Sequence, residues 1–226
     1  DSTTGVRQVG RRAMVVCGAL IVAPDSSIYT PQDLANRLVA LDYGNGTAYA
    51  GLQMLESAMP REAVKTRGFD ANSAKRYAAL MAGEFDATVV QEPWITVAEK
   101  AGCRLVSTTF FYGTWVADDT VDAETYGAFV RATTEAARRI NADKRSYVHY
   151  FKAYDFEPTP EVQALSLDDF NLSRIQVKAP EPIPEADARW DWDWMSRWGV
   201  LNGAYDLESQ INVAVQQAAH AGSVTV

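Results

Sequence analysis

The sequence has few of the side chains that bind metals or transfer groups: two cysteines, Cys17 and Cys103, and two histidines, His149 and His220. Neither cysteine belongs to a CxxC pair, and the histidines form no HxxxH or HExxH zinc motif. We therefore expect no metal site built by this chain alone, and no cofactor. A disulfide between Cys17 and Cys103 stays open, because pairing requires close and correctly aimed Cβ atoms.

Long apolar runs and an excess of basic residues are also missing. The longest apolar run, residues 13–23, ends at Pro24 and is shorter than the roughly 18 residues that a membrane-spanning helix needs. Lys and Arg number 21 against 29 Asp and Glu, which gives a net charge of −8. Phosphate contacts need an excess of positive charge. We expect no membrane span and no nucleic-acid partner.

The composition that remains is that of an ordinary globular protein, with 47% hydrophobic and 22% charged residues. A chain of 226 residues suits one large domain or two small lobes. Residues 1–12 lack the apolar region and cleavage site of a signal peptide. We therefore expect a chain that is either cytoplasmic or already processed.

Apolar runs alternate with segments of helical periodicity along residues 14–153. Runs rich in Val and Ile, such as Met14–Val22, indicate strands that are buried on both faces. The alternation predicts an α/β fold with parallel-rich sheets covered by helices. We expect strands at 14–22, 37–42, 63–69, 85–90, 104–111 and 115–117, a short helix that begins near Pro31 after Thr30, and further helices at 48–59, 73–81, 94–101, 122–141 and 146–153.

The composition changes in the last third of the chain. Residues 155–188 contain most of the prolines, which is typical of a wrapping segment or a linker. Trp190, Trp194 and Trp198 then recur every four residues, so they lie on one stripe of a helix. The stripe is either an aromatic platform for a ligand or the packed face of a docking helix, because aromatic side chains dominate packing area.

A glycine-containing loop, LDYGNGTAY at residues 41–49, follows one predicted strand and precedes a predicted helix. Its glycines do not fit the spacing of a dinucleotide fingerprint, and it has no lysine for a phosphate loop. The N–H groups of Gly46, Thr47 and Ala48 would instead form a site for an anion or polar ligand at the helix start, beside Tyr43 and Asn45. The alternative is a tight turn in which Asn45 or Gly46 is left-handed and Thr47 only caps the helix.

The segment VVQEPW, residues 89–94, has the same order of strand, polar residues and helix start. Because ligands of open α/β sheets bind at the carboxyl ends of strands, we expect Gln91, Glu92 and Trp94 to line a pocket with the first loop. The alternative is that Glu92 complements the helix dipole and that Trp94 is a core residue.

Tyr112 and Trp115 flank a glycine in TTFFYGTW, residues 108–115. We interpret the break at 112–114 as a hinge or a pocket wall, with an aromatic cluster under a loop as the alternative. Cys17 is the weak candidate for a nucleophile, but it lies in an apolar run, and buried cysteines are usually packing residues. His149 is interpreted as an ordinary histidine of a helix.

The order of these motifs resembles a known family. VAPDSSIYTPQDL (residues 22–34), RLVALDYGNGTAY (37–49) and ALMAGEFDATVVQEPW (79–94) are similar to motifs of the NMT1/THI5-like substrate-binding proteins of the sulfonate, nitrate and taurine type. Gly83 and Asp86 hold expected places, and Gly46 and Thr47 fall at the family's ligand-contacting helix start. The family's Gly-Lys before the second strand is replaced here by Asn36 and Arg37.

The resemblance implies a two-lobed type II periplasmic-binding fold. Residues 1–37 would form part of lobe 1 and the hinge, and residues 38–110 would form lobe 2. Residues 111–226 would return to lobe 1 and add the Pro-rich wrapping segment and the Trp-rich C-terminal helix. The family usually has many more residues before the PDS turn than this chain has. We therefore expect a second polypeptide or a cleaved N-terminal segment to complete lobe 1.

The family resemblance implies that a small organic molecule, anionic or aromatic, binds in an interlobe cleft, as in ABC-transporter substrate-binding proteins. The alternative is an enzyme on the same fold, a hydrolase or a C–S or C–C lyase, with catalytic residues partly supplied by the missing segment or a second subunit. A subunit that binds no ligand is the third reading. A transport receptor would be periplasmic or lipid-anchored, whereas an enzyme would be cytoplasmic.

Overall fold

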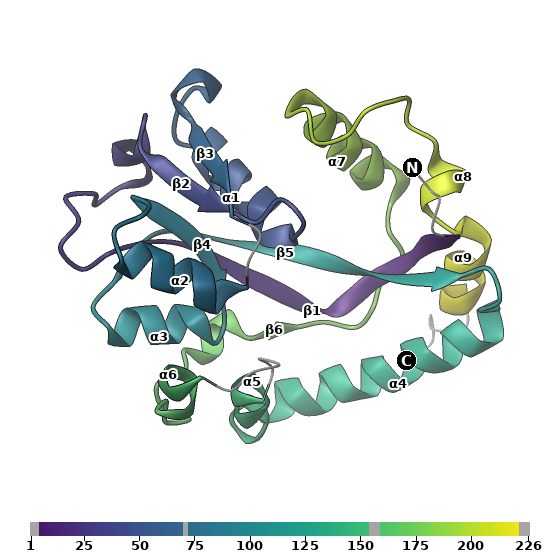
Figure 1. The fold of residues 1–226 in the computed structure, drawn as a ribbon. Helices are drawn as coiled ribbons and strands as arrows, with labels where there is room; N and C mark the ends of the chain where they lie inside the picture. The colour runs from purple at the N-terminus through teal and green to yellow at the C-terminus, as the bar shows by residue number, and fades with distance from the viewer. Residues whose placement is uncertain (1–4, 70–71, 154–158, 222–226) are drawn as a thin grey trace. The chain divides into compact units, whose positions relative to one another are not determined.

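The central feature of the chain is a six-stranded sheet with the strand order β3-β2-β4-β1-β5, in which β6 also pairs with β1. The computed structural model describes residues 5–69, 72–153 and 159–221. Figure 1 labels the elements along the chain. Their bounds are β1 (Val6–Val22), β2 (Leu38–Leu41), β3 (Lys65–Gly68), β4 (Ala87–Gln91), β5 (Arg104–Asp118), β6 (Gln176–Val177), α1 (Gly46–Glu56), α2 (Ser73–Met81), α3 (Trp94–Lys100), α4 (Ala123–Ala142), α5 (His149–Lys152), α6 (Pro160–Gln163), α7 (Glu185–Arg197), α8 (Leu207–Gln210) and α9 (Val213–Ala221), with 3₁₀ helices η1 (Pro31–Leu34), η2 (Arg61–Ala63), η3 (Lys144–Tyr147) and η4 (Leu172–Arg174).

Contacts divide the chain into two units. Unit 1 comprises residues 1–14, 112–142 and 177–226, and unit 2 comprises residues 15–111 and 143–176. Strands β1 and β5 contribute residues to both units. The units differ from the predicted lobes in three places, since residues 15–37, residue 111 and residues 143–176 belong to unit 2. The first of these joins unit 2 because Gly18 to Ile21 pair with β4.

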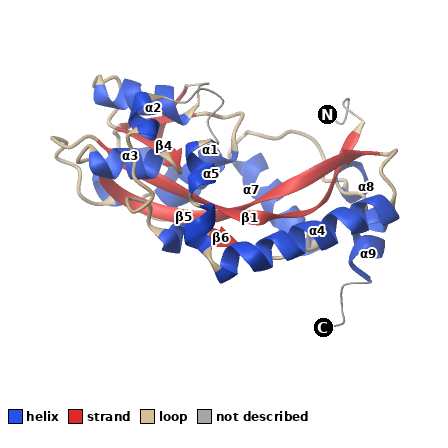
Figure 2. Cartoon of the chain, turned by 90° about the horizontal axis from the view of Figure 1, so that it is seen from below, coloured by secondary structure: helices blue, strands red, loops and turns tan. Residues whose placement is uncertain are grey.

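The sheet is mixed rather than purely parallel. Strand β2 pairs in parallel with β3 and with β4. Strand β1 runs antiparallel to β4, with Gly18 opposite Gln91 and Ile21 opposite Thr88, and the long strands can be followed in Figure 2. The predicted α/β fold is confirmed, and β1 adds an antiparallel pairing to the parallel strands β3, β2 and β4.

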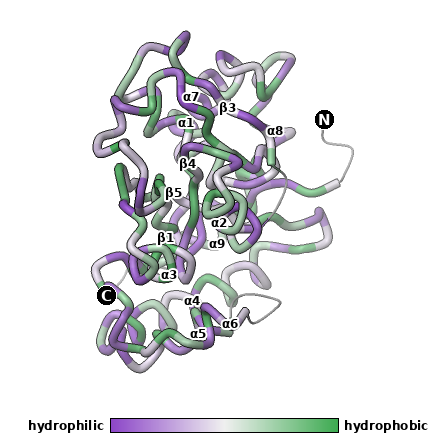
Figure 3. Tube along the Cα trace, turned by 60° about the vertical axis from the view of Figure 1, so that its left-hand side comes forward, coloured by the Kyte–Doolittle hydropathy of each residue, from purple (hydrophilic) through white to green (hydrophobic). Residues whose placement is uncertain are grey.

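The core of unit 2 lies on the strands that the apolar runs predicted. Residues 19–22 of β1 are fully buried, and residues 87–90 of β4 are at most 1% exposed. Helices α2 and α3 pack on β4, and the hydropathy of each residue is drawn in Figure 3. Strands covered on both faces need continuous apolar sequence, and these two strands have it.

Unit 1 is built on the long helix α4, which packs against α9. Tyr126 and Val130 of α4 form a buried cluster with Val9 and Ala219, and Trp115 packs on this cluster. Phe129, which precedes Val130 on α4, is 40% exposed.

Several predicted elements differ from the structure in their bounds. Strand β1 begins at Val6 rather than at Met14, and the helix at Pro31 is a 3₁₀ turn. The break expected at residues 112–114 is wrong, because β5 continues from Arg104 to Asp118. Gly113 does not interrupt the strand there; it leaves room for the side chain of Arg12, which a Cβ would overlap.

The tail has short elements joined by extended chain. Residues 155–158 of the predicted Pro-rich segment lie outside the described residues, and the rest of that segment holds α6, η4, β6 and the start of α7. The tryptophan stripe on α7 is confirmed by stacked rings at 6.3 Å for Trp190 and Trp194. Of the helices in the described ranges, none is long and apolar enough to cross a membrane.

Candidate functional site

Asn45 caps the start of α1 in unit 2. Its side-chain oxygen accepts hydrogen bonds from the Thr47 N–H at 3.0 Å and the Thr47 hydroxyl at 3.3 Å, and its carbonyl accepts from the Ala48 N–H at 3.0 Å. Its backbone is extended, with φ of −130°, so the left-handed alternative does not apply, and the cap is Asn45 rather than Thr47. Two of the three N–H groups expected to face a ligand are therefore already bonded. The N–H of Gly46, the first helical residue, is one of the orphan donors of the first turn.

Phe111 packs on this helix start, although no sequence pattern had indicated it. A Cβ at Gly46 would lie 2.8 Å from Cε2 of the Phe111 ring, and a Cβ at Gly18 would lie 3.5 Å from Cε1. Glycine at both positions thus lets the ring approach the backbone of α1 and of β1. Phe111 is revealed by this long-range contact, which joins it to residues far away in the sequence.

Gln91, the last residue of β4, lies close to Gly18, which also neighbours Phe111. It is half-buried and pairs with Gly18 in the sheet. Gly18 therefore lies beside both Gln91 and the Phe111 ring, which in turn covers Gly46. The structure brings together two of the predicted site residues, Gly46 and Gln91, within unit 2.

A buried arginine, Arg76 of α2, bonds to the loop that precedes α1 and to strand β4. Its guanidinium donates to the carbonyl of Val89 at 3.1 Å, to the hydroxyl of Thr47 at 3.4 Å and to the carboxylate of Asp42 at 3.3 Å. Burial lowers the pKa of Arg76, while Asp42 opposes that shift. Arg76 is 1% exposed, so it holds the loop in place and does not face solvent.

The buried face of α2 is not the one that its apolar spacing indicates. Apolar residues recur at Ala74, Tyr77, Ala78 and Met81, but Met81 is 43% exposed. The residues that are buried lie one position away and include the charged one: Ser73, Arg76, Ala79 and Leu80.

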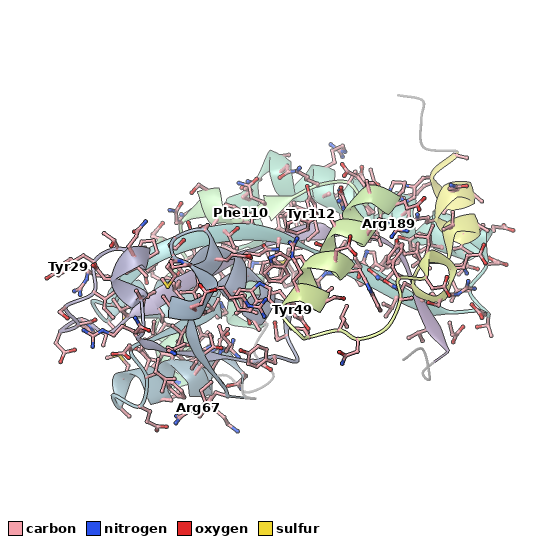
Figure 4. The ribbon with its side chains drawn as sticks, turned by 90° about the horizontal axis from the view of Figure 1, so that it is seen from above. Tyr29, Tyr49, Arg67, Phe110, Tyr112 and Arg189 are labelled. Atoms are coloured by element: carbon pink, nitrogen blue, oxygen red, sulfur yellow. The ribbon has the colours of Figure 1, made fainter. Side chains whose placement is uncertain are left out.

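Two tyrosines border the loop. The Tyr43 hydroxyl lies 2.6 Å from that of Thr66, and the Tyr49 hydroxyl donates to the Tyr43 carbonyl at 3.3 Å. Burial raises the pKa of Tyr49, with Asp42 adding to the shift. Tyr43 is 36% exposed, and Tyr49 is labelled in Figure 4. Tyr43 thus retains exposed ring surface beside α1.

Glu92 and Trp94 are buried. Glu92 accepts from the Thr96 N–H at 3.2 Å, the Thr96 hydroxyl at 2.8 Å and Arg174 at 2.8 Å. Burial raises the pKa of Glu92, against the opposing effect of Arg174 and Thr96. Trp94 is 2% exposed and packs on Tyr77 at 5.3 Å between ring centroids. These positions favour the alternative that Glu92 bonds the first turn of α3 and Trp94 fills the core.

The remaining predicted site residues, Tyr112 and Trp115, lie in unit 1. Lys178 donates to the Tyr112 hydroxyl at 2.8 Å, and the Arg11 guanidinium lies 4.6 Å from the centre of the Tyr112 ring. Trp115 packs edge-on against Phe129 at 4.9 Å between centroids. Tyr112 therefore has two cationic neighbours, and Trp115 belongs to the packing of α4.

Cys17 has the surroundings of a packing residue. It is 4% exposed, and burial raises the pKa of its thiol. A nucleophilic thiol needs the opposite shift. Cys17 and Cys103 are both free thiols. In the part of the chain that the structure describes, no cluster of His, Cys, Asp and Glu could hold a metal ion.

No protein-family model matches the chain, and no curated protein matches it by sequence. Solved structures do match. The alkanesulfonate-binding protein SsuA from Xanthomonas axonopodis pv. citri, bound to MOPS, has a TM-score of 0.67 at 15% identity over 89% of this chain and 72% of its own. The periplasmic sulfonate-binding protein SsuA from Methylobacillus flagellatus KT reaches 0.69 at 16% identity over 98% and 71%.

An enzyme is similar to the same extent. A mutant of the desulfurization enzyme DSZB, in complex with biphenyl-2-sulfinic acid, has a TM-score of 0.64 at 15% identity over 97% of this chain and 80% of its own. The chain has the two-lobed type II periplasmic-binding fold. At identities of 15–16% the structural likeness establishes the fold alone. The matched structures include both binding proteins and an enzyme, so the fold does not decide between these functions.

Proposed function

We propose that this chain binds a small organic anion with a sulfonate or sulfinate group at the start of α1 in unit 2. The observation that carries the proposal is the likeness, over almost the whole chain, to a sulfonate-binding protein bound to MOPS and to an enzyme bound to a sulfinic acid. Both ligands present sulfur oxyanions. The motif order in residues 22–94 supports the finer proposal that the chain is an NMT1/THI5-like binding protein.

Gly46, Gln91 and Phe111 would make the principal contacts. The Gly46 N–H donates at a helix N-terminus, where the helix dipole places roughly half a positive charge. The half-buried amide of Gln91 supplies a second donor from the neighbouring strand. The Phe111 ring, with Tyr43 beside the loop, would contact the organic part of the ligand.

Asn45, Thr47, Glu92 and Trp94 support this site without forming its direct contacts. Asn45 and Thr47 bond each other across the first turn, and Arg76 ties Thr47 to the sheet beneath. Glu92 fixes the turn between β4 and α3 through Thr96. The ligand thus meets a prearranged loop, which reduces the ordering cost of binding.

Calorimetric titration with MOPS tests the proposal. Gln91→Leu removes the amide donor, and we expect it to weaken binding about tenfold, the effect of a hydrogen bond to a charged group. Gln32→Leu is the matched control, because Gln32 is exposed on η1. No binding of MOPS or of an aryl sulfinate to the wild-type protein, or equal weakening by both substitutions, would overturn the proposal.

An enzyme that acts on an organosulfur anion is the second candidate, and the likeness to DSZB supports it. Cys17 does not favour this function, since its thiol is buried and its pKa is raised. The two functions differ in the fate of the ligand. Mass analysis of an aryl sulfinate after incubation would show it unchanged for a binding protein and desulfinated for an enzyme.

We also propose that a second polypeptide or a cleaved segment completes the molecule. The chain spans 71–72% of the two SsuA proteins that it resembles, and the remaining length would add further structure to unit 1. Native mass spectrometry of the protein from its natural source would detect such a partner. A lone folded chain of 226 residues with full ligand binding would contradict this proposal.

A further inference from the structure

A buried tyrosine hydroxyl in unit 1 has no hydrogen-bond partner among the described residues. Tyr126 of α4 is 4% exposed, and its oxygen is among the buried polar atoms left unbonded. It reaches β1 at Gly10, where a Cβ would overlap it. Leaving such a group unbonded is unfavourable, so its presence calls for an acceptor or donor that the described chain does not supply.

Arg12 on β1 presents a second unbonded donor. Its guanidinium covers Gly113 of β5, and its Nε is buried without a partner. Among the described residues it has no ion pair, whereas the adjacent Arg11 bonds the carboxylates of Glu181 and Asp187. A half-buried guanidinium that lacks a counter-charge within a chain of net charge −8 is unusual.

The third donor is the indole of Trp115. Its Nε1 is also buried and unbonded within the described part of the chain. The ring packs on Phe129 of α4 and on the cluster that contains Tyr126. These contacts place the indole on the side of the strands that α4 covers.

Strand geometry places the three donors on one face. Residues two apart on a strand point to the same side, so Trp115 shares its side of β5 with Gly113, which Arg12 covers. Trp115 also packs on the cluster that contains Tyr126. Arg12 covers Gly113 and Tyr126 covers Gly10, which joins the two strands into one face. The guanidinium and the indole can only donate, so they cannot satisfy each other.

We propose that Arg12, Trp115 and Tyr126 bind a small oxyanion on the α4 side of the unit 1 strands. An oxyanion supplies the acceptors that all three donors lack and the charge that Arg12 lacks. The site belongs to unit 1 alone, and it does not depend on the function proposed for unit 2. Water alone would satisfy the hydrogen bonds but would leave the guanidinium without a counter-charge.

The indole N–H signal of Trp115 reports directly on this site. We would titrate the wild-type protein with sulfate at constant ionic strength and follow the indole region of ¹H–¹⁵N spectra, with Trp115→Phe identifying the signal. We expect a saturable shift of the Trp115 signal, while the indoles of α7 stay in place. A Trp115 signal that does not shift saturably overturns the proposal.

Matched substitutions separate the site from general electrostatics. Arg12→Gln should abolish the saturable shift of the Trp115 signal, whereas Arg11→Gln should not change it. The two variants are matched because each removes one positive charge from adjacent residues of β1. Tyr126→Phe removes only a hydroxyl and should weaken sulfate binding roughly tenfold. The other indole signals verify that each variant is folded. Equal effects of Arg11→Gln and Arg12→Gln, or unchanged affinity in folded Tyr126→Phe, contradict the proposal.

Discussion

Arg76 and Asp42 form an ion pair beneath the loop at the start of α1, with 3.3 Å between Nη1 and Oδ2. The Arg76 side chain is 2% exposed and that of Asp42 17% exposed. The same guanidinium bonds the Val89 carbonyl and the Thr47 hydroxyl. One side chain of α2 thus connects β4, the loop and the first turn of α1.

Removing the charge of Asp42 should destabilise the protein strongly. Asp42→Asn leaves Arg76 buried beside a neutral amide, and breaking such a pair costs about 3–5 kcal/mol. Urea unfolding measures this free energy. Arg37→Gln is the control, because Arg37 is 52% exposed, lies 3.9 Å from Asp86, and should change stability by less than about 1 kcal/mol. Equal effects of the two variants would show that Arg76 does not need its partner.

The helix that carries Arg76 shows how far the sequence can be interpreted. Its bounds, Ser73–Met81, were predicted from apolar spacing and agree with the structure. The buried face of the helix does not follow from the apolar spacing. The periodicity of apolar residues cannot detect a buried arginine whose charge is paired with an aspartate far away in the sequence. Burial of a charge depends on partners far away in sequence, and Asp42 is 34 residues from Arg76.

The candidate site shows the same limit. The sequence predicted that the loop at 41–49 precedes a helix, and it singled out Gly46 and Gln91. Phe111 was missed, since its contact with Gly46 joins residues that no local pattern connects. The strand break expected beside Phe111 was wrong for a related reason: Gly113 leaves space for Arg12, and glycine in a strand can indicate a close approach rather than a turn.

Substitution of Gly46 by alanine should show how tightly Phe111 packs. The new Cβ would lie 2.8 Å from Cε2 of the ring, and such overpacking costs about 1–3 kcal/mol. Phe111→Leu should relieve part of this cost, so the two substitutions should be coupled by about 0.5–3 kcal/mol in a double-mutant cycle of urea unfolding. Gly44→Ala is the control, because its Cβ would meet only Asp42 at 3.5 Å. Strictly additive free energies would exclude the contact.

The two ends of the tryptophan stripe on α7 should differ in their contribution to stability. Trp194 is 3% exposed and Trp190 52% exposed. Trp194→Ala should cost about 3–5 kcal/mol, as large truncations in a core do, whereas Trp190→Ala should cost less than about 1 kcal/mol. Thermal and urea unfolding measure both. A larger effect at Trp190 would mean that the exposed ring is covered by a partner in the protein as purified.

The ionisation of Tyr126 should reduce stability at alkaline pH. Burial raises its pKa from 10.0 to about 12, so between these values the unfolded chain loses a proton that the folded chain keeps. The unfolded state then binds fewer protons, and the free energy of unfolding falls as pH rises through this window. Tyr126→Phe should remove that component, and the exposed Tyr150→Phe is the control. Urea unfolding from pH 9 to pH 12 gives the slope of the free energy of unfolding against pH for each variant. The same slope in Tyr126→Phe as in the wild-type protein would show that the pKa of Tyr126 does not differ between the folded and unfolded states.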